Sequence, residues 1–216
     1  MGYHRAGFEV VGVDIKPQPH YPFEFHQGDA MTWPLAGFDA IHASPPCQGY
    51  SRMRHLPWLK DREYPLLIEP VRARLAPLGV PYVIENVEGA PLDPAVMLCG
   101  LDFGLRMYRH RWFESNYLLM AQSHQAHKEV IGAGRLLGSR YSRASAGVTG
   151  MLPDPAGHSA GASTRAAAAA MGVEWMDRDE MTQAIPPAYT EWIGRQLMPS
   201  IGVPPVEVVT ELTFPF

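Results

Sequence analysis

The sequence predicts an α/β protein, in which helices pack against a β-sheet. Strand-like and helix-like segments alternate along the first half of the chain, as they do in α/β folds. Polar side chains follow several of the strand-like runs, where open α/β sheets bind ligands. The chain has 216 residues, of which 46% are hydrophobic and 19% are charged. It therefore suits one globular domain with a substantial core.

Four strands and one helix are expected in the first half. Short apolar runs bounded by loop signals lie at 9–15, 23–26, 40–43 and 81–87. Residues 64–78 repeat an apolar side chain every three or four positions, which predicts an amphipathic helix. These side chains are Leu67, Val71, Leu75 and Leu78. Gly79 follows them, as glycine often does at a helix C-terminus.

The second half begins with a strand and an irregular insert. Residues 108–117 are aromatic and basic and predict a strand. Residues 123–162 are rich in Gly, Ser, Ala and Arg, have little periodicity and indicate an irregular segment. A strand-like run at 206–209 lies in the Pro-rich tail, and the sequence assigns it no role.

Three helices are expected after the insert. The first contains the alanines of 166–170, which favour a helix. The second begins at Asp177, because Glu180 three residues later matches a capping box. The third follows Pro186-Pro187 and carries four apolar side chains on one face. They are Tyr189, Trp192, Ile193 and Leu197.

Acidic or nucleophilic side chains follow four of the predicted strands. They are Asp14, Asp29, Cys47 and Glu85. The carboxyl ends of parallel strands lie along one edge of a sheet, and that edge is where α/β folds bind ligands. An aspartate at such a position has an ordinary alternative as a turn or helix-capping residue. Four such positions together predict a ligand site.

Cys47 is the candidate nucleophile. It follows the apolar run 39–43 and the segment Ser44-Pro45-Pro46. Two consecutive prolines fix φ and lack amide hydrogens, so they present the next residue in a stiff, extended conformation. A thiol held in this way beyond the end of a strand suits covalent catalysis. The alternative is a small apolar residue that ends a strand.

Charge, cysteine content and apolar runs narrow the classes of protein to which this chain can belong. The formal net charge is −4, which argues against a protein that coats nucleic acid, although basic side chains outnumber acidic ones within 122–165. Two cysteines form no disulfide framework and indicate a reducing cytoplasm. No apolar run approaches the roughly 18 residues of a membrane span, and no signal-peptide pattern opens the chain. None of the nine histidines has zinc-site spacing, so no metal is predicted.

Several blocks, in this order, resemble the cytosine carbon-5 DNA methyltransferases of small phage and bacterial type. The blocks are 39–48 ending in Pro45-Pro46-Cys47-Gln48, Glu85-Asn86-Val87, 98–105, Arg109-His110-Arg111 and 184–189. The resemblance covers most of the chain except the insert. It implies a Rossmann-like sheet that binds S-adenosylmethionine.

The resemblance also implies a chemistry. Carbon 5 of cytosine is a poor nucleophile until a thiolate adds to carbon 6, and Cys47 is identified as that thiolate. A carboxyl group with a raised pKa can donate to ring nitrogen 3, which suits Glu85. Arg109 and Arg111 lie two apart on an expected extended segment, so they should project to the same side and hold the cytosine carbonyl or a phosphate. A surface strand is the alternative for this pair.

Further residues follow from the same resemblance. Five are implied to contact the substrate: Pro46, Gln48, Ser51, Asn86 and Val87. Five are implied to bind the cofactor: Asp14, Ile15, Asp29, Ala30 and Pro45. Duplex DNA must present a flipped cytosine, because a stacked ring does not expose both faces of its reacting carbons. A cognate restriction endonuclease, in a bacterial or phage-infected cell, is the further partner considered.

The cofactor side departs from the family pattern. Members begin with a strand and a glycine-rich loop, Asp-x-Phe-x-Gly-x-Gly-Gly, whereas residues 1–8 resemble the helix that follows that loop. We therefore expect the first strand and loop to be missing and cofactor binding by residues 1–216 to be weak. The expected parts are a catalytic core at 1–115, a target-recognition insert at 116–170, C-terminal helices at 171–198 and a tail at 199–216.

Three functions stay open at this point. The first is an S-adenosylmethionine-dependent methyltransferase acting on cytosine in DNA. The second is an inactive or decoy DNA-binding remnant of such an enzyme. The third is the same chemistry on tRNA or on a free cytosine nucleotide.

Overall fold

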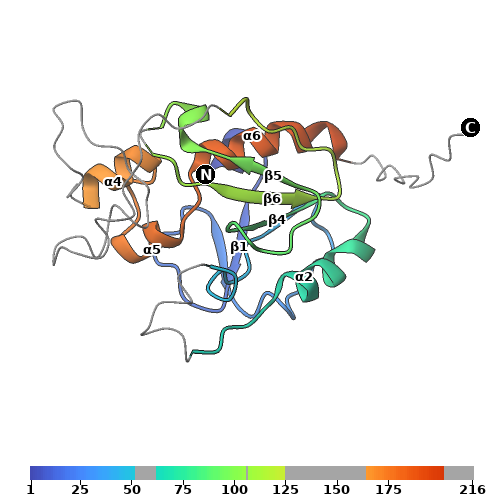
Figure 1. The fold of residues 1–216 in the computed structure, drawn as a ribbon. Helices are drawn as coiled ribbons and strands as arrows, with labels where there is room; N and C mark the ends of the chain where they lie inside the picture. Colours follow the sequence, from blue (N-terminus) through green and yellow to red (C-terminus); the bar gives the residue numbers. More distant parts are fainter. Residues whose placement is uncertain (52–61, 106, 125–163, 202–216) are drawn as a thin grey trace, which may run out of the picture.

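The protein is a mixed α/β structure with helices on both faces of its larger sheet (Figure 1). A computed structural model describes residues 1–51, 62–105, 107–124 and 164–201. Most of the predicted insert and the run at 206–209 lie outside these residues. Within them, no helix has the length and apolar character needed to cross a membrane.

The described strands form two hydrogen-bonded sheets. In the first, β1 (Val11–Asp14) pairs in parallel with β2 (Glu24–Gln27). The second contains β3 (Ile41–Ala43), β4 (Tyr82–Asn86), β5 (Ala95–Leu98) and β6 (Arg111–Ser115), in the order β3-β4-β6-β5. β3 and β4 are parallel, whereas β6 is antiparallel to both of its neighbours.

The single edge of parallel strand ends expected from the sequence is therefore only partly correct. The carboxyl ends of β1 and β2 belong to one sheet and those of β3 and β4 to the other. β6 runs in the opposite direction, because the chain reverses between β5 and β6 and the two strands pair side by side. The sequence pattern did not reveal β5, which follows Pro94 and has only four residues.

The predicted elements of the first half are present, most of them with shorter bounds and β2 shifted by one residue. The amphipathic helix is α2 (Ile68–Leu75), followed by a 3₁₀ turn, η2 (Ala76–Leu78). Gly79 then adopts a left-handed conformation with φ of 71°, which confirms it as a helix-terminating glycine. Residues 2–5, within the segment expected to be helical, form α1 (Gly2–Arg5).

The three C-terminal helices are also confirmed. They are α4 (Thr164–Met171), α5 (Arg178–Gln183) and α6 (Pro187–Leu197), after which comes a 3₁₀ turn, η5 (Met198–Ser200). The capping box predicted at α5 forms, because the Asp177 side chain accepts the Glu180 amide while the Glu180 side chain accepts the Asp177 amide. Pro187 opens α6, where its fixed φ suits the first turn.

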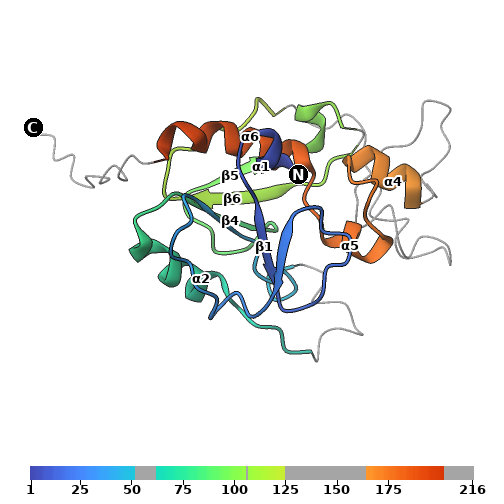
Figure 2. The same ribbon diagram turned by 180° about the vertical axis from the view of Figure 1, so that it is seen from behind.

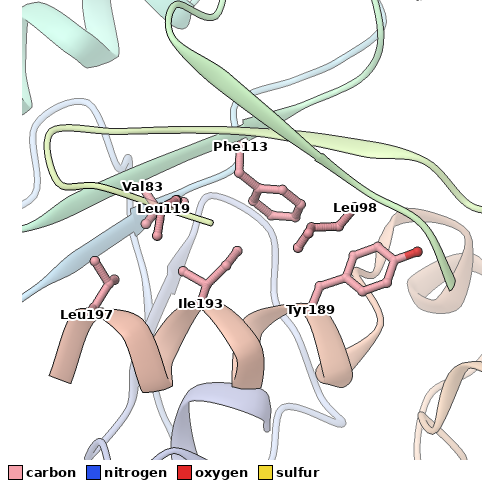
Figure 3. Close-up of a cluster of buried hydrophobic side chains, with 7 residues drawn as sticks. All are labelled: Val83, Leu98, Phe113, Leu119, Tyr189, Ile193 and Leu197. Carbon is pink, nitrogen blue, oxygen red and sulfur yellow. The ribbon is translucent and has the colours of Figure 1, made fainter. Parts of the chain in front are cut away.

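The main core lies between α6 and the β4-β6-β5 sheet (Figure 3). Tyr189, Ile193 and Leu197 point from α6 toward the strands. Their partners are Val83, Leu98, Phe113 and Leu119. Side chains alternate along β4, so Tyr82 and Ile84 face the other side and pack with Leu75 of α2. β4 is buried along its whole length for this reason.

α1 packs against α6 (Figure 2), and small residues permit the close approach. A Cβ atom on Gly2 would lie 2.1 Å from the carbonyl oxygen of Pro187. Gly194 on α6 would meet Tyr3 and Ala6 in the same way. This contact brings the first residues of the chain, including the partly buried Tyr3, next to β3.

A second, smaller core lies where α4 and α5 pack on the segment that precedes β6. Its buried members are Met107, Ala168, Met171, Val173 and Met181. This cluster fixes the connection between α5 and α6, whose carbonyl oxygens accept hydrogen bonds from Arg109.

Candidate active site

Cys47 lies in a turn that the end of β4 holds in place. The Tyr50 and Ser51 amides donate to the Cys47 carbonyl oxygen over 3.0 and 2.9 Å, so the chain turns immediately after the cysteine. Asn86, which is fully buried, donates its side-chain amide to the Pro45 carbonyl oxygen over 2.9 Å. The stiff Pro45-Pro46 segment is thus hydrogen-bonded to the neighbouring strand, and the half-buried Cys47 follows it.

Glu85 and Arg111 form a largely buried ion pair at the same end of the sheet. Glu85 lies directly opposite Phe113, and Arg111 is two residues before Phe113 on β6. Since side chains alternate along a strand, the two project from the same face. Arg111 Nε is 3.0 Å from Glu85 Oε1, and the side chains are 17% and 8% exposed.

Burial and the neighbouring charges have opposite effects on the pKa of Glu85. Burial raises the pKa of the Glu85 carboxyl group above its ordinary value. The Arg111 charge, a hydrogen bond from the Ser44 hydroxyl and the Arg109 charge lower it in part. A carboxyl group that stays protonated to higher pH can donate a hydrogen bond, which a carboxylate cannot do.

Cys47 shares these electrostatic neighbours. Burial raises the pKa of the Cys47 thiol, and the Glu85 charge adds to the rise. The charges of Arg111 and Arg109 act in the opposite direction and favour the thiolate. Cys47, Glu85, Arg109 and Arg111 therefore interact as one electrostatic group, although they come from three separate segments of the sequence.

Arg109 corrects one prediction. It was expected to lie on an extended segment with Arg111 and to project to the same side, but β6 begins only at Arg111. Arg109 has a φ of 30°, in the left-handed region, so the alternation of a strand does not extend to it. Its guanidinium donates to the carbonyl oxygens of Thr182 and Ala184, over 2.9 and 3.0 Å.

The position of Arg109 is fixed from both its side chain and its backbone. The Tyr189 hydroxyl donates to the Arg109 carbonyl oxygen over 2.9 Å. The side chain is buried, and both burial and the Arg111 charge lower its pKa. Arg109 thus attaches the start of β6 to the α5–α6 connection while its charge still acts on Glu85 and Cys47.

A hydrogen-bonded chain that the sequence did not indicate leads from α1 to Glu85. The Tyr3 hydroxyl lies 2.7 Å from His42 Nδ1, and His42 Nε2 lies 3.0 Å from Ser44 Oγ. The Ser44 hydroxyl in turn hydrogen-bonds the Glu85 side chain. Burial lowers the pKa of His42 to about 4, which favours the neutral ring. A neutral ring accepts from Tyr3 and donates to Ser44.

The sequence contained one signal of this series of hydrogen bonds. His42 and Ser44 are two residues apart at the end of a predicted strand, and so share a face. Tyr3 gave no such signal, because only the packing of α1 against α6 brings it to β3.

The remaining predicted substrate residues surround Cys47. Pro46 and Gln48 are exposed on either side of it, and Ser51 ends its turn. The Val87 amide donates to the side-chain oxygen of Asn86 over 3.0 Å. Pro45 is buried, and its carbonyl oxygen is the acceptor for Asn86.

The predicted cofactor residues lie mainly at the ends of β1 and β2. The Asp14 carboxylate accepts from the Lys16 amide and the Gln18 side chain over 2.8 and 3.1 Å. Asp29 accepts from the Met31 amide over 2.8 Å. Both aspartates therefore stabilise local turns, the ordinary alternative for such residues. Ile15 is 66% exposed, and the Ala30 carbonyl oxygen accepts from Arg74 over 2.6 Å.

Comparisons with models of protein families, with curated proteins and with solved structures found no match. The fold and the site define a mixed α/β protein with a cysteine, a buried carboxyl group and two arginines grouped at the carboxyl ends of β3 and β4.

Proposed function

We propose that the protein is a DNA cytosine carbon-5 methyltransferase that uses S-adenosylmethionine and forms a covalent adduct through Cys47. One observation carries the proposal: the Asn86 hydrogen bond to Pro45 holds the Cys47 turn against the strand that carries the Arg111-paired Glu85. A thiol, a carboxyl group of raised pKa and a cation are the groups required for nucleophilic addition to a cytosine ring.

The first step is addition of the Cys47 thiolate to carbon 6 of cytosine. A bond forms between sulfur and carbon 6, and the electron pair of the 5,6 double bond is displaced into the ring toward nitrogen 3. The thiolate is the reactive form, and the charges of Arg111 and Arg109 favour it against the effect of burial. These arginines are therefore assigned to activation of Cys47 as well as to binding.

Glu85 is assigned as the hydrogen-bond donor to ring nitrogen 3 of cytosine. As the adduct forms, negative charge develops at this nitrogen, and a protonated carboxyl group can donate to it. Burial favours the protonated form of Glu85. Arg111 fixes the orientation of the carboxyl group through the 3.0 Å contact with Oε1 and can turn a remaining donor toward the cytosine carbonyl.

The adduct makes carbon 5 nucleophilic, and this carbon gains the methyl group. Loss of the carbon-5 proton to water or hydroxide then regenerates the 5,6 double bond as the bond between sulfur and carbon 6 breaks. The Cys47 thiolate is restored, so the protein undergoes no net change. Pro46, Gln48, Ser51 and Val87 lie around the turn and are assigned to contacts with the flipped nucleotide.

Residues at the ends of β1 and β2 are assigned to the cofactor. S-adenosylmethionine, when bound, would supply the methyl group by cleavage of its sulfur–methyl bond and would leave as S-adenosylhomocysteine. Ile15 exposes an aliphatic face directly after Asp14, as a surface that contacts an adenine ring requires. Asp14 would accept from ribose hydroxyls, and Asp29 with Ala30 would lie toward the adenine amino group. Pro45 would separate this region from Cys47.

A non-catalytic DNA-binding protein is the second candidate. It is favoured by the local hydrogen bonds of Asp14 and Asp29, which already use carboxylate oxygens that a cofactor would need. A third possibility is the same chemistry on tRNA or on a free nucleotide.

Methyl transfer separates these candidates. Purified protein is incubated with S-adenosylmethionine carrying a radioactive methyl group and with duplex DNA, tRNA or dCMP in parallel. We expect label in DNA cytosine, loss of labelling in Cys47→Ala, and retention in Arg195→Gln, which alters only an exposed ion pair on α6. Greater labelling of tRNA or dCMP than of DNA would assign that molecule as the substrate. No labelling by folded protein would favour the non-catalytic candidate.

A further inference from the structure

A second group of potential ligands lies where β5 ends and β6 begins, at the same end of the sheet as Arg111 but made of residues not assigned above. The side chains of Cys99, His110 and His124 each place a ligand atom within 4.8 Å of the other two. Cys99 is fully buried, and the rings of His110 and His124 meet edge to face with centroids 5.3 Å apart.

The register of the sheet explains why Cys99 and His110 meet. Leu98 on β5 pairs with Arg111 on β6, so the next position outward places Cys99 across from His110. The Gly100 amide donates to the Tyr108 carbonyl oxygen over 2.8 Å and continues this pairing past the strand ends. A Cβ atom on Gly100 would lie 2.4 Å from the Met107 carbonyl oxygen, so only glycine permits this approach.

α6 and η3 (Gly100–Phe103) bring His124 to the same place. Trp192 of α6 donates to the Met120 carbonyl oxygen over 2.8 Å, and the Gln196 side chain accepts the Met120 amide over 2.7 Å. These bonds fix the segment that leads to His124. The His124 Nδ1 atom then lies 3.1 Å from the carboxylate of Asp102, which is only 6% exposed.

We infer that Cys99, His110 and His124 form a binding site for a divalent zinc-like metal ion, with Asp102 orienting His124. One thiolate and two imidazoles are ligands that Zn²⁺ prefers. Tetrahedral Zn²⁺ with bonds of about 2.0–2.3 Å needs ligand atoms roughly 3.5 Å apart, so the three side chains need only a small inward adjustment.

Asp102 adds a feature typical of metal-binding histidines. A carboxylate that accepts from one ring nitrogen fixes the tautomer and leaves the other nitrogen for the metal. Asp102 contacts His124 Nδ1, so Nε2 is the assigned ligand atom. Three protein ligands leave a fourth position for water. Metal binding at these residues would overturn the expectation, drawn from the spacing of cysteines and histidines, that no metal binds.

Within the described residues, one other group of this kind exists, and it makes a weaker candidate. His20, Asp177 and Glu180 also lie within 4.8 Å of one another, but two of them are exposed. Asp177 and Glu180 already accept the amides of the α5 capping box. The helix cap therefore accounts for these two carboxylates without a metal. His20 is used as the control position in the experiment below.

Co²⁺ is the probe for the experiment, because its bond to a thiolate gives a charge-transfer band and its visible spectrum reports tetrahedral coordination. The full-length protein is stripped with a chelator and titrated with Co²⁺, then with Zn²⁺ in competition. We expect one Co²⁺ per chain, a thiolate band, displacement by Zn²⁺, and a rise in melting temperature on binding. Absence of a thiolate band from folded protein would overturn the proposal.

Variants identify the ligands. Cys99→Ser should abolish the thiolate band, whereas Cys47→Ala and His20→Gln should retain it. Because Cys99 is buried and its variant could fail to fold, His124→Gln provides a partly exposed ligand change that should weaken Co²⁺ binding at least tenfold. Asp102→Asn should weaken it about 10- to 100-fold by releasing the His124 ring. Loss of the band in Cys47→Ala, or unchanged affinity in folded His124→Gln, would contradict the assignment.

Discussion

Arg111 Nε lies 3.0 Å from Glu85 Oε1 in a setting where both side chains are largely removed from solvent. The arginine contacts the carboxyl group on the strand to which the Cys47 turn is attached. It also acts on the thiol itself, since its charge opposes the rise in the Cys47 pKa caused by burial. This pair therefore connects the stability of the sheet to the reactivity of the cysteine.

Arg111→Ala should destabilise the fold and make the Cys47 thiol harder to ionise. Removal of one partner from a buried pair costs about 3–5 kcal/mol, with a smaller loss if Glu85 becomes protonated. The Cys47 pKa should rise, since the largest charge opposing its burial is lost. Thiol alkylation rates measured against pH report that pKa, and urea unfolding reports the stability.

A second, partly buried ion pair gives the control. Arg72 of α2 and Glu114 of β6 are 2.6 Å apart, and neither is a predicted catalytic residue. Arg72→Ala should lower stability without a change in the alkylation profile of Cys47. Equal profiles in wild type and Arg111→Ala would contradict the proposed role of Arg111.

Glu85→Gln should separate catalysis from stability. Loss of the proton donor should slow methyl transfer by about 10²–10⁴-fold. Burial raises the folded-state pKa of Glu85 above its unfolded value, so its stabilising contribution is present at low pH and lost as pH rises through the folded pKa. The glutamine variant should therefore lose less stability than wild type as pH rises from about 4.5. Denaturant unfolding at several pH values measures the difference, and parallel pH dependences would argue against a raised pKa.

His42 should contribute to acid destabilisation. Its pKa is about 4 in the folded protein against 6.5 for the ordinary group. A depressed pKa gives stability that is complete above pH 6.5 and is lost as pH falls toward 4. The full loss is at most about 3 kcal/mol. His42→Gln should flatten this part of the stability profile, and NMR titration of the ring in wild type checks the pKa directly. A ring that titrates near 6.5 would contradict the account.

Two asparagines that hydrogen-bond near opposite ends of β4, Asn86 on β4 itself and Asn116 directly after β6, allow a controlled test of the Cys47 turn. Asn86 donates to the Pro45 carbonyl oxygen, whereas Asn116 accepts the Tyr82 amide and donates to Val80. Each alanine variant should cost roughly 1–3 kcal/mol, because buried backbone groups lose their partners. Only Asn86→Ala should slow methyl transfer. Similar rates for the two variants would show that the turn does not depend on Asn86.

The sequence predicted the α/β class and most elements, because apolar periodicity and capping residues are local signals. α2, the left-handed Gly79 and the Asp177 capping box are examples. The bounds were less accurate, and the short strand β5 was missed. Its pairing with β6 joins residues whose order along the chain contains no sign of contact.

The candidate site was also predicted only in part, because some of its contacts follow from local signals and others depend on long-range packing. Cys47 and Glu85 each follow a strand, so their proximity could be inferred from a parallel arrangement of β3 and β4. The position of Arg109 could not, because its φ of 30° and its bonds to Thr182 and Ala184 depend on how α5 packs. The grouping of Cys99 with two histidines likewise depends on strand register and on α6.

Formation of a covalent bond between Cys47 and a cytosine is the most direct test. The protein is incubated with S-adenosylmethionine and duplex DNA containing 5-fluorocytosine, whose fluorine cannot leave as the carbon-5 proton does. The adduct is then located by peptide mass spectrometry. A stable adduct on the peptide containing Cys47, absent from Cys47→Ala, is the predicted result. Recovery of folded protein with unmodified Cys47, or an adduct on Cys99, would contradict the account.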